Sequence, residues 1–335
     1  MNSYTFDVLS HLEEERFVTL NKERLQAVAV MLVKEEFCLP SWRDAVFPED
    51  DRQFVEFIGV ANTINFCFFA RLDKRYDVEY PTGSGRIWHG SMAMAAALKR
   101  ALDEEIPILN PDFLYRKLTA RDMLHIFRSE TTEMPLLSMR AVYLQGYGRA
   151  LSENHLGFFP NKKFYDIFQG ADFFAFNHHG VPGIVDRLVD LPRIFRDRSL
   201  YRGYELPFNK RAMLVALVYY GRAASSGGNL TPLKDPHGLG PIADCQVPKI
   251  LHHLGILHYN KELSDMIDSR ELIRHGGDEE LEIRIKTVRA MSLLLLNINY
   301  LRREEITMAE LDYKLWSLGR SATGLQHHRT ITTAY

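Results

Sequence analysis

The sequence predicts a mainly α-helical protein with a small β element, and three observations support this fold class. Most segments repeat apolar residues every three or four positions, as helices that bury one face do. Segments rich in β-branched and aromatic residues are few and short. The chain has 335 residues and is 46% hydrophobic, so it can bury one large core or two ordinary ones. We therefore expect a single domain over residues 1–335, for which a division into two lobes stays open.

The N-terminal part of the chain predicts helix first and strand afterwards. Apolar residues recur at spacings of three to five within residues 21–34, and a helical pattern is assigned to residues 1–48. Residues 54–80 shift toward β-branched and aromatic side chains. Within them, residues 64–69 and 76–80 predict short strands. The small β element is therefore expected in this region.

The rest of the chain predicts a series of helices. Residues 91–105 are rich in Ala and Met and contain no Gly or Pro, which favours a helix. Thr119 and Asp122 form a capping-box pattern at the start of another helix, which should run to about residue 128. Further helices are expected at residues 136–151, 164–169, 181–188, 210–223, 248–254, 261–267, 279–300 and 308–317.

The charge balance argues against a nucleic-acid polymer as partner. Lys and Arg number 41 and Asp and Glu number 43, which gives a formal net charge of −2. A protein that neutralises many backbone phosphates normally carries a basic excess. A ligand with a single phosphate group is compatible with this balance. The sequence therefore favours a small-molecule ligand, and it leaves the oligomeric state open.

No segment of the sequence predicts export or insertion into a membrane. Residues 1–15 are acidic and lack an apolar stretch of signal-peptide length. The most apolar window, residues 290–298, contains Ser292 and Asn297 and is much shorter than the roughly 20 residues that cross a bilayer. The three cysteines are too few and too far apart for a disulfide framework. We therefore expect a cytoplasmic protein.

Asp244 is the first candidate site residue, because it stands just before an expected helix. Pro248 suits the first turn of that helix, since it has no amide hydrogen and a preset φ. A carboxylate in this place lies near the positive end of the helix dipole, which stabilises negative charge. Two roles fit the position, a helix cap and a catalytic carboxylate.

Three further polar residues are candidates, each with a simpler structural interpretation. Asp312 and Tyr313 lie beside the apolar face of the helix expected at residues 308–317, where solvated residues are also common. Lys210 opens the helix expected at residues 210–223, where a cation is unfavourable to the helix dipole. A long basic side chain at such a place can instead extend to water.

The sequence supports neither a metal site nor a nucleotide cofactor. The adjacent pairs of histidines do not chelate one ion, because neighbouring residues of a helix or strand point in different directions. These pairs are residues 178–179, 252–253 and 327–328. The sequence contains no glycine-rich dinucleotide or P-loop motif and no nucleophile elbow. We therefore expect chemistry without metal or cofactor.

Short motifs that occur in order over most of the chain resemble those of the queuosine salvage family of queuosine 5′-phosphate N-glycosidases. They are NTINFCF at 62–68, RALDEEIPI at 100–108, FRSE at 127–130, MPL at 134–136, FRD at 195–197, KRA at 210–212, AD and VP at 243–244 and 247–248, LDY and LW at 311–313 and 315–316, and HR at 328–329. Their number and order make a chance resemblance improbable.

This resemblance implies a fold, a reaction and a set of site residues. The fold would be a helical architecture like that of helix-hairpin-helix DNA glycosylases. The reaction would release queuine from queuosine 5′-phosphate, which salvages the base for tRNA modification. Carried over by motif, Asp244 is the catalytic aspartate and Lys210 is its partner. Asp312 and Tyr313 belong to the pocket for the base.

The chain departs from the family pattern at three positions that the resemblance assigns to substrate binding. Ile242 stands where eukaryotic members have Phe, so an aromatic surface for stacking the base is missing there. Asn62 stands where Asp is often found, and Ser317 where a second acidic residue occurs. These changes bear on the choice of base more than on the type of reaction.

The implied reaction gives each residue a role. Cleavage of an N-glycosidic bond passes through a ribosyl cation, which Asp244 would stabilise or trap as a sugar ester. Lys210 would orient Asp244, and Asp312 would accept hydrogen bonds from N1–H and the 2-amino group of the base. Two alternatives stay open. One is a non-catalytic or altered-specificity binder of a modified nucleoside or nucleotide, and the other is a DNA or RNA glycosylase, which should show a cationic face.

Overall fold

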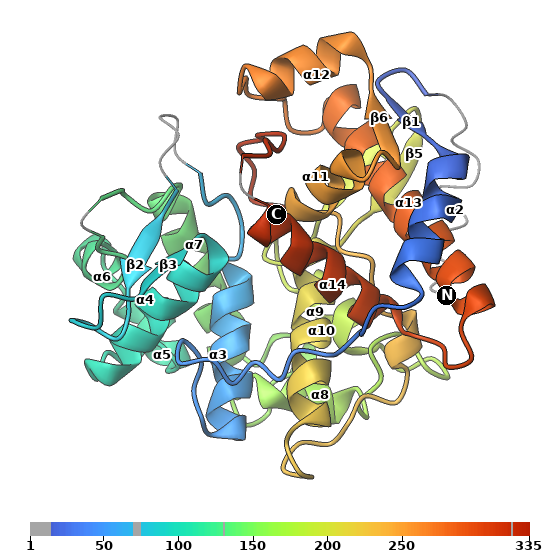
Figure 1. The fold of residues 1–335 in the computed structure, drawn as a ribbon. Coiled ribbons are helices and arrows are strands. Elements are labelled where there is room, and N and C mark those ends of the chain that lie inside the picture. The colour runs from blue at the N-terminus through green and yellow to red at the C-terminus, as the bar shows by residue number, and fades with distance from the viewer. Residues whose placement is uncertain (1–14, 70–74, 130, 323) are drawn as a thin grey trace. The chain divides into compact units, whose positions relative to one another are not determined.

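The computed structural model of the protein describes residues 15–69, 75–129, 131–322 and 324–335 (Figure 1). Over these residues it contains the α-helices α2 to α14 and three pairs of short antiparallel strands. The prediction of a mainly α fold with a small β element is therefore confirmed.

The chain divides into two compact units. Unit 1 consists of Met1–Pro40, Asp197–Met213 and Asp235–Thr332. Unit 2 consists of Ser41–Arg196, Leu214–Lys234 and Thr333–Tyr335. Whether these two units form a single domain, as the sequence predicted, stays a prediction.

Unit 1 is built from helices and two strand pairs. Its helices are α2 (Lys22–Leu32), the short 3-10 helix η2 (Pro236–Gly238), α11 (Gln246–His253), α12 (Lys261–Asp268), α13 (Asp278–Leu301) and α14 (Met308–Ser321). Its strands are β1 (Val18–Leu20) with β6 (Leu257–Tyr259), and β4 (Arg198–Tyr201) with β5 (Tyr204–Pro207). Helix α10 (Lys210–Ala224) begins in unit 1, and its later turns belong to unit 2.

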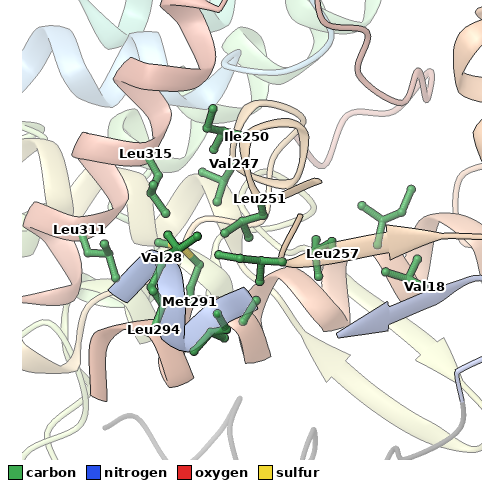
Figure 2. Close-up of a cluster of buried hydrophobic side chains, with 14 of the residues drawn as sticks. Val18, Val28, Val247, Ile250, Leu251, Leu257, Met291, Leu294, Leu311 and Leu315 are labelled. Carbon is green, nitrogen blue, oxygen red and sulfur yellow. The ribbon is translucent and has the colours of Figure 1, made fainter. Parts of the chain in front are cut away.

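The core of unit 1 forms where α2, α11, α13 and α14 pack together with β1 and β6. Figure 2 shows fully buried side chains from these elements, among them Val18, Val28, Val247, Leu251, Leu257, Met291, Leu294, Leu311 and Leu315. Burying a side chain of this size is worth about 1.5–3 kcal/mol. The cluster therefore holds α11 and α14 against the long helix α13. Asp244 precedes α11, and Asp312 is part of α14.

Unit 2 is also mainly helical. Its elements are α3 (Asp51–Thr63), β2 (Asp77–Glu79) with β3 (Ile87–His89), α4 (Ser91–Asp103), α5 (Pro111–Arg116), α6 (Ala120–Ile126), α7 (Leu137–Ser152), the 3-10 helix η1 (His155–Gly157), α8 (Tyr165–Gly170) and α9 (Ile184–Asp190). Helix α5 packs closely on α7 at Gly148, where an added Cβ would lie 2.6 Å from the carbonyl oxygen of Pro111. A glycine is needed there because the two backbones approach so closely.

Most of the predicted helices are confirmed, with bounds that shift by a few residues. The capping box at Thr119 and Asp122 is present at the start of α6. Helix α11 ends at a turn in which Gly255 has a φ of +74°, and Ile256 and Leu257 after it are fully buried. Helix α5 and strands β1, β3, β4, β5 and β6 were not predicted. The likeness to helix-hairpin-helix glycosylases stays a prediction.

Helix α3 was not predicted, although residues 54–63 belong to the segment whose pattern shifts toward β-branched and aromatic side chains. Residues 51–63 form helix α3, whose start is capped by the side chain of Asp50, which accepts a hydrogen bond from the amide of Gln53 at 2.7 Å. The aromatic and β-branched side chains of this segment are buried on the helix, so tertiary packing overrides their strand propensity. Residues 64–69, predicted as a strand, do not form one, apart from an isolated bridge between Phe69 and Arg75. The strand predicted at 76–80 is confirmed as β2.

The helix assigned to residues 1–48 is shorter than predicted. Among the described residues 15–48, the helix covers Lys22–Leu32, and Val18–Leu20 is a strand because it pairs with β6 from much later in the chain. Residues 1–14 lie outside the described residues. Within the part of the chain that the structure describes, no helix combines the length and the apolar character needed to cross a membrane.

Candidate active site

Asp244 caps the start of helix α11. Its Oδ1 atom accepts hydrogen bonds from the amides of Gln246 at 2.8 Å and Val247 at 3.1 Å. The carboxylate thereby satisfies two amides that have no partner within the helix. Pro248 lies in the first turn, as the sequence predicted. Among the described residues no hydrogen bond reaches Oδ2, so capping leaves one oxygen of this partly exposed side chain available for another role.

Asp312 reaches the same loop from helix α14. Its side chain is buried, and its Oδ1 atom accepts a hydrogen bond from the amide of Ile242 at 2.9 Å. Two turns later on α14, a Cβ added at Gly319 would lie 2.8 Å from the carbonyl oxygen of Gln246. The absence of a side chain at Gly319 therefore lets α14 lie directly against the first turn of α11. This close packing brings Asp312 next to the segment that carries Asp244.

The burial of Asp312 changes its protonation. The pKa of its carboxyl is raised to about 8 as the net result of several effects: removal from water and the negative charge of Asp244 raise it, and the hydrogen bond from Ile242 lowers it. Lys210 lowers the pKa in turn, but not enough to restore the ordinary value. At neutral pH the carboxyl is therefore mostly protonated in the free protein. The simpler interpretation of Asp312 as a solvated helix residue is wrong.

Lys210 is buried at the first position of α10 and does not extend to water. Burial lowers the pKa of its ammonium group, whereas Asp244 raises it and the neighbouring Arg211 lowers it. The electrostatic effects of Asp244 on both Lys210 and Asp312 mean that the three groups lie close together. The structure thus brings together four of the predicted site residues, Asp244, Lys210, Asp312 and Ile242.

A buried ion pair that the sequence interpretation missed supports this cluster. Both nitrogens at the end of the Arg284 side chain bind Asp197, with Nη1–Oδ1 at 3.0 Å and Nη2–Oδ2 at 2.6 Å. Neither side chain is more than 1% exposed. The charged plane of Arg284 lies 3.9 Å from the centre of the Phe208 ring. Asp197 belongs to the FRD motif at 195–197, but no local pattern indicated its partner on α13.

The remaining predicted site residues have other surroundings. Tyr313 is half-buried on α14 and stacks on Trp316, with ring centres 6.0 Å apart. Ser317 lies on the same helix and is half-buried. Asn62 belongs to α3 of unit 2, where it is buried, donates to the carbonyl oxygen of Ile58 at 3.0 Å and accepts from Asn65 at 3.1 Å. The roles of these three residues in binding stay predictions.

The arrangement in unit 1 is suited to stabilising a positive charge on a substrate. It combines a carboxylate on a helix start, a buried ammonium group and a second carboxyl group with a raised pKa. Carboxyl groups kept in different protonation states are typical of sites that cleave glycosidic bonds. A helical fold that carries such groups fits the glycosidase class of protein.

Comparison with known proteins makes the assignment specific. Residues 46–335 match the family model described as queuosine salvage protein, and the chain therefore belongs to the queuosine salvage family. A relative from Sphaerobacter thermophilus is 32% identical over 97% of this chain and 95% of its own length. Relatives from Schizosaccharomyces pombe and Bos taurus are each 30% identical, over 81% and 84% of this chain and 76% and 81% of their own lengths. All three are named queuosine 5′-phosphate N-glycosylase/hydrolase.

Proposed function

We propose that this protein hydrolyses the N-glycosidic bond of queuosine 5′-phosphate and releases queuine for tRNA modification. The observation that carries the proposal is the family match, because it covers residues 46–335 and includes every candidate site residue. The names of the relatives support the substrate. The protonation states in unit 1 support the type of reaction.

In this proposal Asp244 stabilises the cation that forms at C1′ of the ribose. Its Oδ1 atom stays on the amides of α11, so the carboxylate is held rigidly while Oδ2 faces the sugar. A preorganised charge costs no reorganisation at the moment of reaction, which is why such groups are effective in catalysis. The carboxylate either stabilises the cation until water attacks or forms a short-lived ester with the sugar.

Lys210 and Asp312 act on either side of this carboxylate in the proposal. The buried ammonium of Lys210 orients Asp244 and balances its charge. Asp312 recognises the guanine-like edge of the base, since a carboxylate can accept hydrogen bonds from N1–H and the 2-amino group together. Those two donors favour the ionised form, so binding of the base below pH 8 should release the proton of Asp312. Tyr313, Ile242, Ser317 and Asn62 complete the binding of the substrate.

The compartment and the ligand class are part of the same proposal. Cys38, Cys67 and Cys245 form no disulfide with one another, and Cys38 is exposed, which fits a reducing cytoplasm. The near-neutral net charge of −2 fits a mononucleotide better than a nucleic-acid polymer.

The direct test is to incubate the purified protein with queuosine 5′-phosphate and to measure free queuine by mass spectrometry. We expect release without added metal or cofactor. Binding of the nucleotide without any release would favour the non-catalytic binder. Release from a tRNA or DNA strand, with an affinity that falls steeply with salt, would favour the polymer glycosylase.

The second test replaces Asp244 by Asn. The amide oxygen of Asn can still accept from Gln246 and Val247, so the fold should survive. Loss of the charge should lower kcat by about two to three orders of magnitude. Circular dichroism, thermal unfolding and turnover would be measured on one preparation. A stable Asp244→Asn variant with near-normal turnover would show that Asp244 is only a helix cap.

A further inference from the structure

The buried pair of Asp197 and Arg284 contacts the backbone on both sides of the candidate site. Besides its two bonds to Arg284, the Asp197 Oδ2 atom accepts a hydrogen bond from the amide of Lys210 at 3.1 Å. The carbonyl oxygen of Asp197 accepts another from the amide of Asn209 at 3.0 Å. Asp197 therefore fixes the start of α10, and with it the point from which the Lys210 side chain extends.

Arg284 reaches the other side of the site. Its Nε atom donates to the carbonyl oxygen of Ala243 at 3.3 Å, one residue before Asp244. A guanidinium group can make these three bonds at once because its donors are arranged in a rigid plane. The Ala243 carbonyl and the Lys210 amide are thus joined through one rigid pair of side chains.

The rest of the surroundings keep Arg284 in place. Phe208 lies against one face of the guanidinium group, and Glu280, one turn earlier on α13, lies 3.8 Å from Nη1. Burial opposes the charge of Glu280, but a hydrogen bond with His275 and the charge of Arg284 lower its pKa to about 2. Arg284 is therefore held between two carboxylates.

We infer that Asp197 and Arg284 form a positioning pair, which sets the distance between the Lys210 ammonium and the Asp244 carboxylate in the reaction. The inference rests on the proposed function, because it assigns to the pair a role in that reaction. The pair touches neither the sugar nor the base in this role. It acts only through the backbone on either side of the two reacting side chains.

A second buried pair offers a matched control. In unit 2, Arg222 binds Asp51 with Nε–Oδ1 at 2.6 Å, and the two side chains are 0% and 7% exposed. Arg222 also donates to backbone carbonyls, those of Trp42, Pro48 and Glu49. The pair is of the same kind and is similarly buried, although Arg222 makes one bond to its carboxylate and three to carbonyls. None of its partners is a candidate site residue.

The test compares Arg284→Lys with Arg222→Lys. Lys keeps the charge, but its single nitrogen cannot reach all the partners that either guanidinium group binds, so both variants should lose a similar amount of thermal stability. Arg284→Lys should also lower kcat by about 10- to 100-fold with a KM changed less than about threefold, since small displacements of reacting groups cost this much. Arg222→Lys should leave kcat unchanged. Asp197→Asn, which keeps an oxygen for the Lys210 amide, serves if Arg284→Lys does not fold.

A second readout does not depend on catalysis. Acetic anhydride would be used to label lysines at several pH values, and mass spectrometry would give the rate at Lys210. Arg284→Lys should raise this rate severalfold because Lys210 loses its fixed start, whereas Arg222→Lys should not. Equal labelling of Lys210 in the two variants would overturn the inference. Wild-type protein that releases no queuine would overturn the proposed function, and the labelling result would still decide the role of the pair.

Discussion

The two units contain the same kind of buried ion pair with different consequences. In unit 1, Arg284 and Asp197 join the start of α10 to the loop before α11. In unit 2, Arg222 and Asp51 join α10 to the segment before α3, and Asp51 also accepts from Arg43 and Asn229. Burial of an Arg–Asp pair is thus not by itself a sign of function. The backbone atoms that the pair holds decide whether it affects a site.

Two other features of unit 1, a carboxyl group and a glycine, also have a counterpart in unit 2. Each unit has a buried or half-buried carboxyl that accepts backbone amides and has a raised pKa, Asp312 in unit 1 and Glu56 in unit 2. Each also has a glycine at a close approach of helices, Gly319 and Gly148. These matched features allow effects on stability to be separated from effects on the site.

The largest effect on stability is expected from deleting one partner of each pair. Asp197→Ala and Asp51→Ala each leave a buried guanidinium group without its carboxylate, which should cost about 3–5 kcal/mol of the free energy of unfolding. Urea unfolding would measure both. Asp172→Ala, which breaks an exposed pair with Lys234, should cost less than about 1 kcal/mol. If Asp197→Ala or Asp51→Ala lost no more free energy of unfolding than Asp172→Ala, the buried pair would contribute little to stability.

The pH dependence of KM is expected to show a smaller effect, which should distinguish Asp312 from Glu56. Asp312 must lose its proton to accept both donors of the base, so KM should fall about tenfold per pH unit as the pH rises toward 8 and level off above it. From pH 6 to 8 this amounts to roughly 2 kcal/mol. Asp312→Asn should raise KM more than it lowers kcat, and its KM should no longer depend on pH.

Glu56→Gln is the control for this pH dependence. Glu56 accepts hydrogen bonds from the amides of Phe164 and Tyr165 within unit 2, and burial raises its pKa. Its loss should leave the pH dependence of KM as in the wild type. An Asp312→Asn variant with unchanged KM and a much lower kcat would instead place Asp312 in proton transfer.

Substrate affinity should rise with pH, whereas the stability of the free protein should fall with pH because of Asp312. The folded pKa of about 8 lies above the ordinary value of 3.8, so the folded state holds a proton that the unfolded chain releases between these values. The free energy of unfolding therefore falls as the pH rises through this window. Asp312→Asn should unfold at a higher temperature than the wild type at pH 9, with a smaller difference at pH 5, which lies near the lower end of this window. Thermal unfolding at the two pH values would measure it, and equal shifts at both would contradict the raised pKa.

The last comparison concerns the two glycines, whose effect on stability should be smaller than that of the buried pairs. Gly319→Ala and Gly148→Ala each insert a methyl group against a backbone atom, which should cost about 1–3 kcal/mol. Gly319→Ala displaces α14 from the first turn of α11, so it should also lower kcat. Gly148→Ala should lower only the unfolding temperature. Equal effects on kcat would show that the packing of α14 on α11 does not position the site.

Local signals in the sequence predicted much of the fold. Helices with regular apolar spacing, such as α4, α10 and α13, were found because burial of one face follows the helical period. Caps were predicted correctly at Thr119 because the required atoms lie within one turn. Strand β1 was missed because its partner β6 lies more than two hundred residues later. Helix α3 was not predicted because the packing of its aromatic and β-branched side chains overrides their strand propensity.

The site was predictable only in part, for the same reason. The position of Asp244 before a helix with Pro248 in its first turn is a local feature, and the structure confirms it. Four charged residues of α13 are buried, namely Glu280, Glu282, Arg284 and Lys286, and the sequence interpretation assigned them no role. No short-range pattern predicts that a helix buries such residues, because each needs a partner that another segment supplies.

The sequence by itself determined the class of fold, the family and the presence of a carboxylate at the start of α11, since each depends on local spacing or on ordered motifs. Only the tertiary structure decided the burial of Lys210, the protonation of Asp312 and the pairing of Asp197 with Arg284, which are 87 residues apart in the chain. The physical reason is that removal from water and the charge of distant neighbours control these groups, and both arise only when the segments pack together.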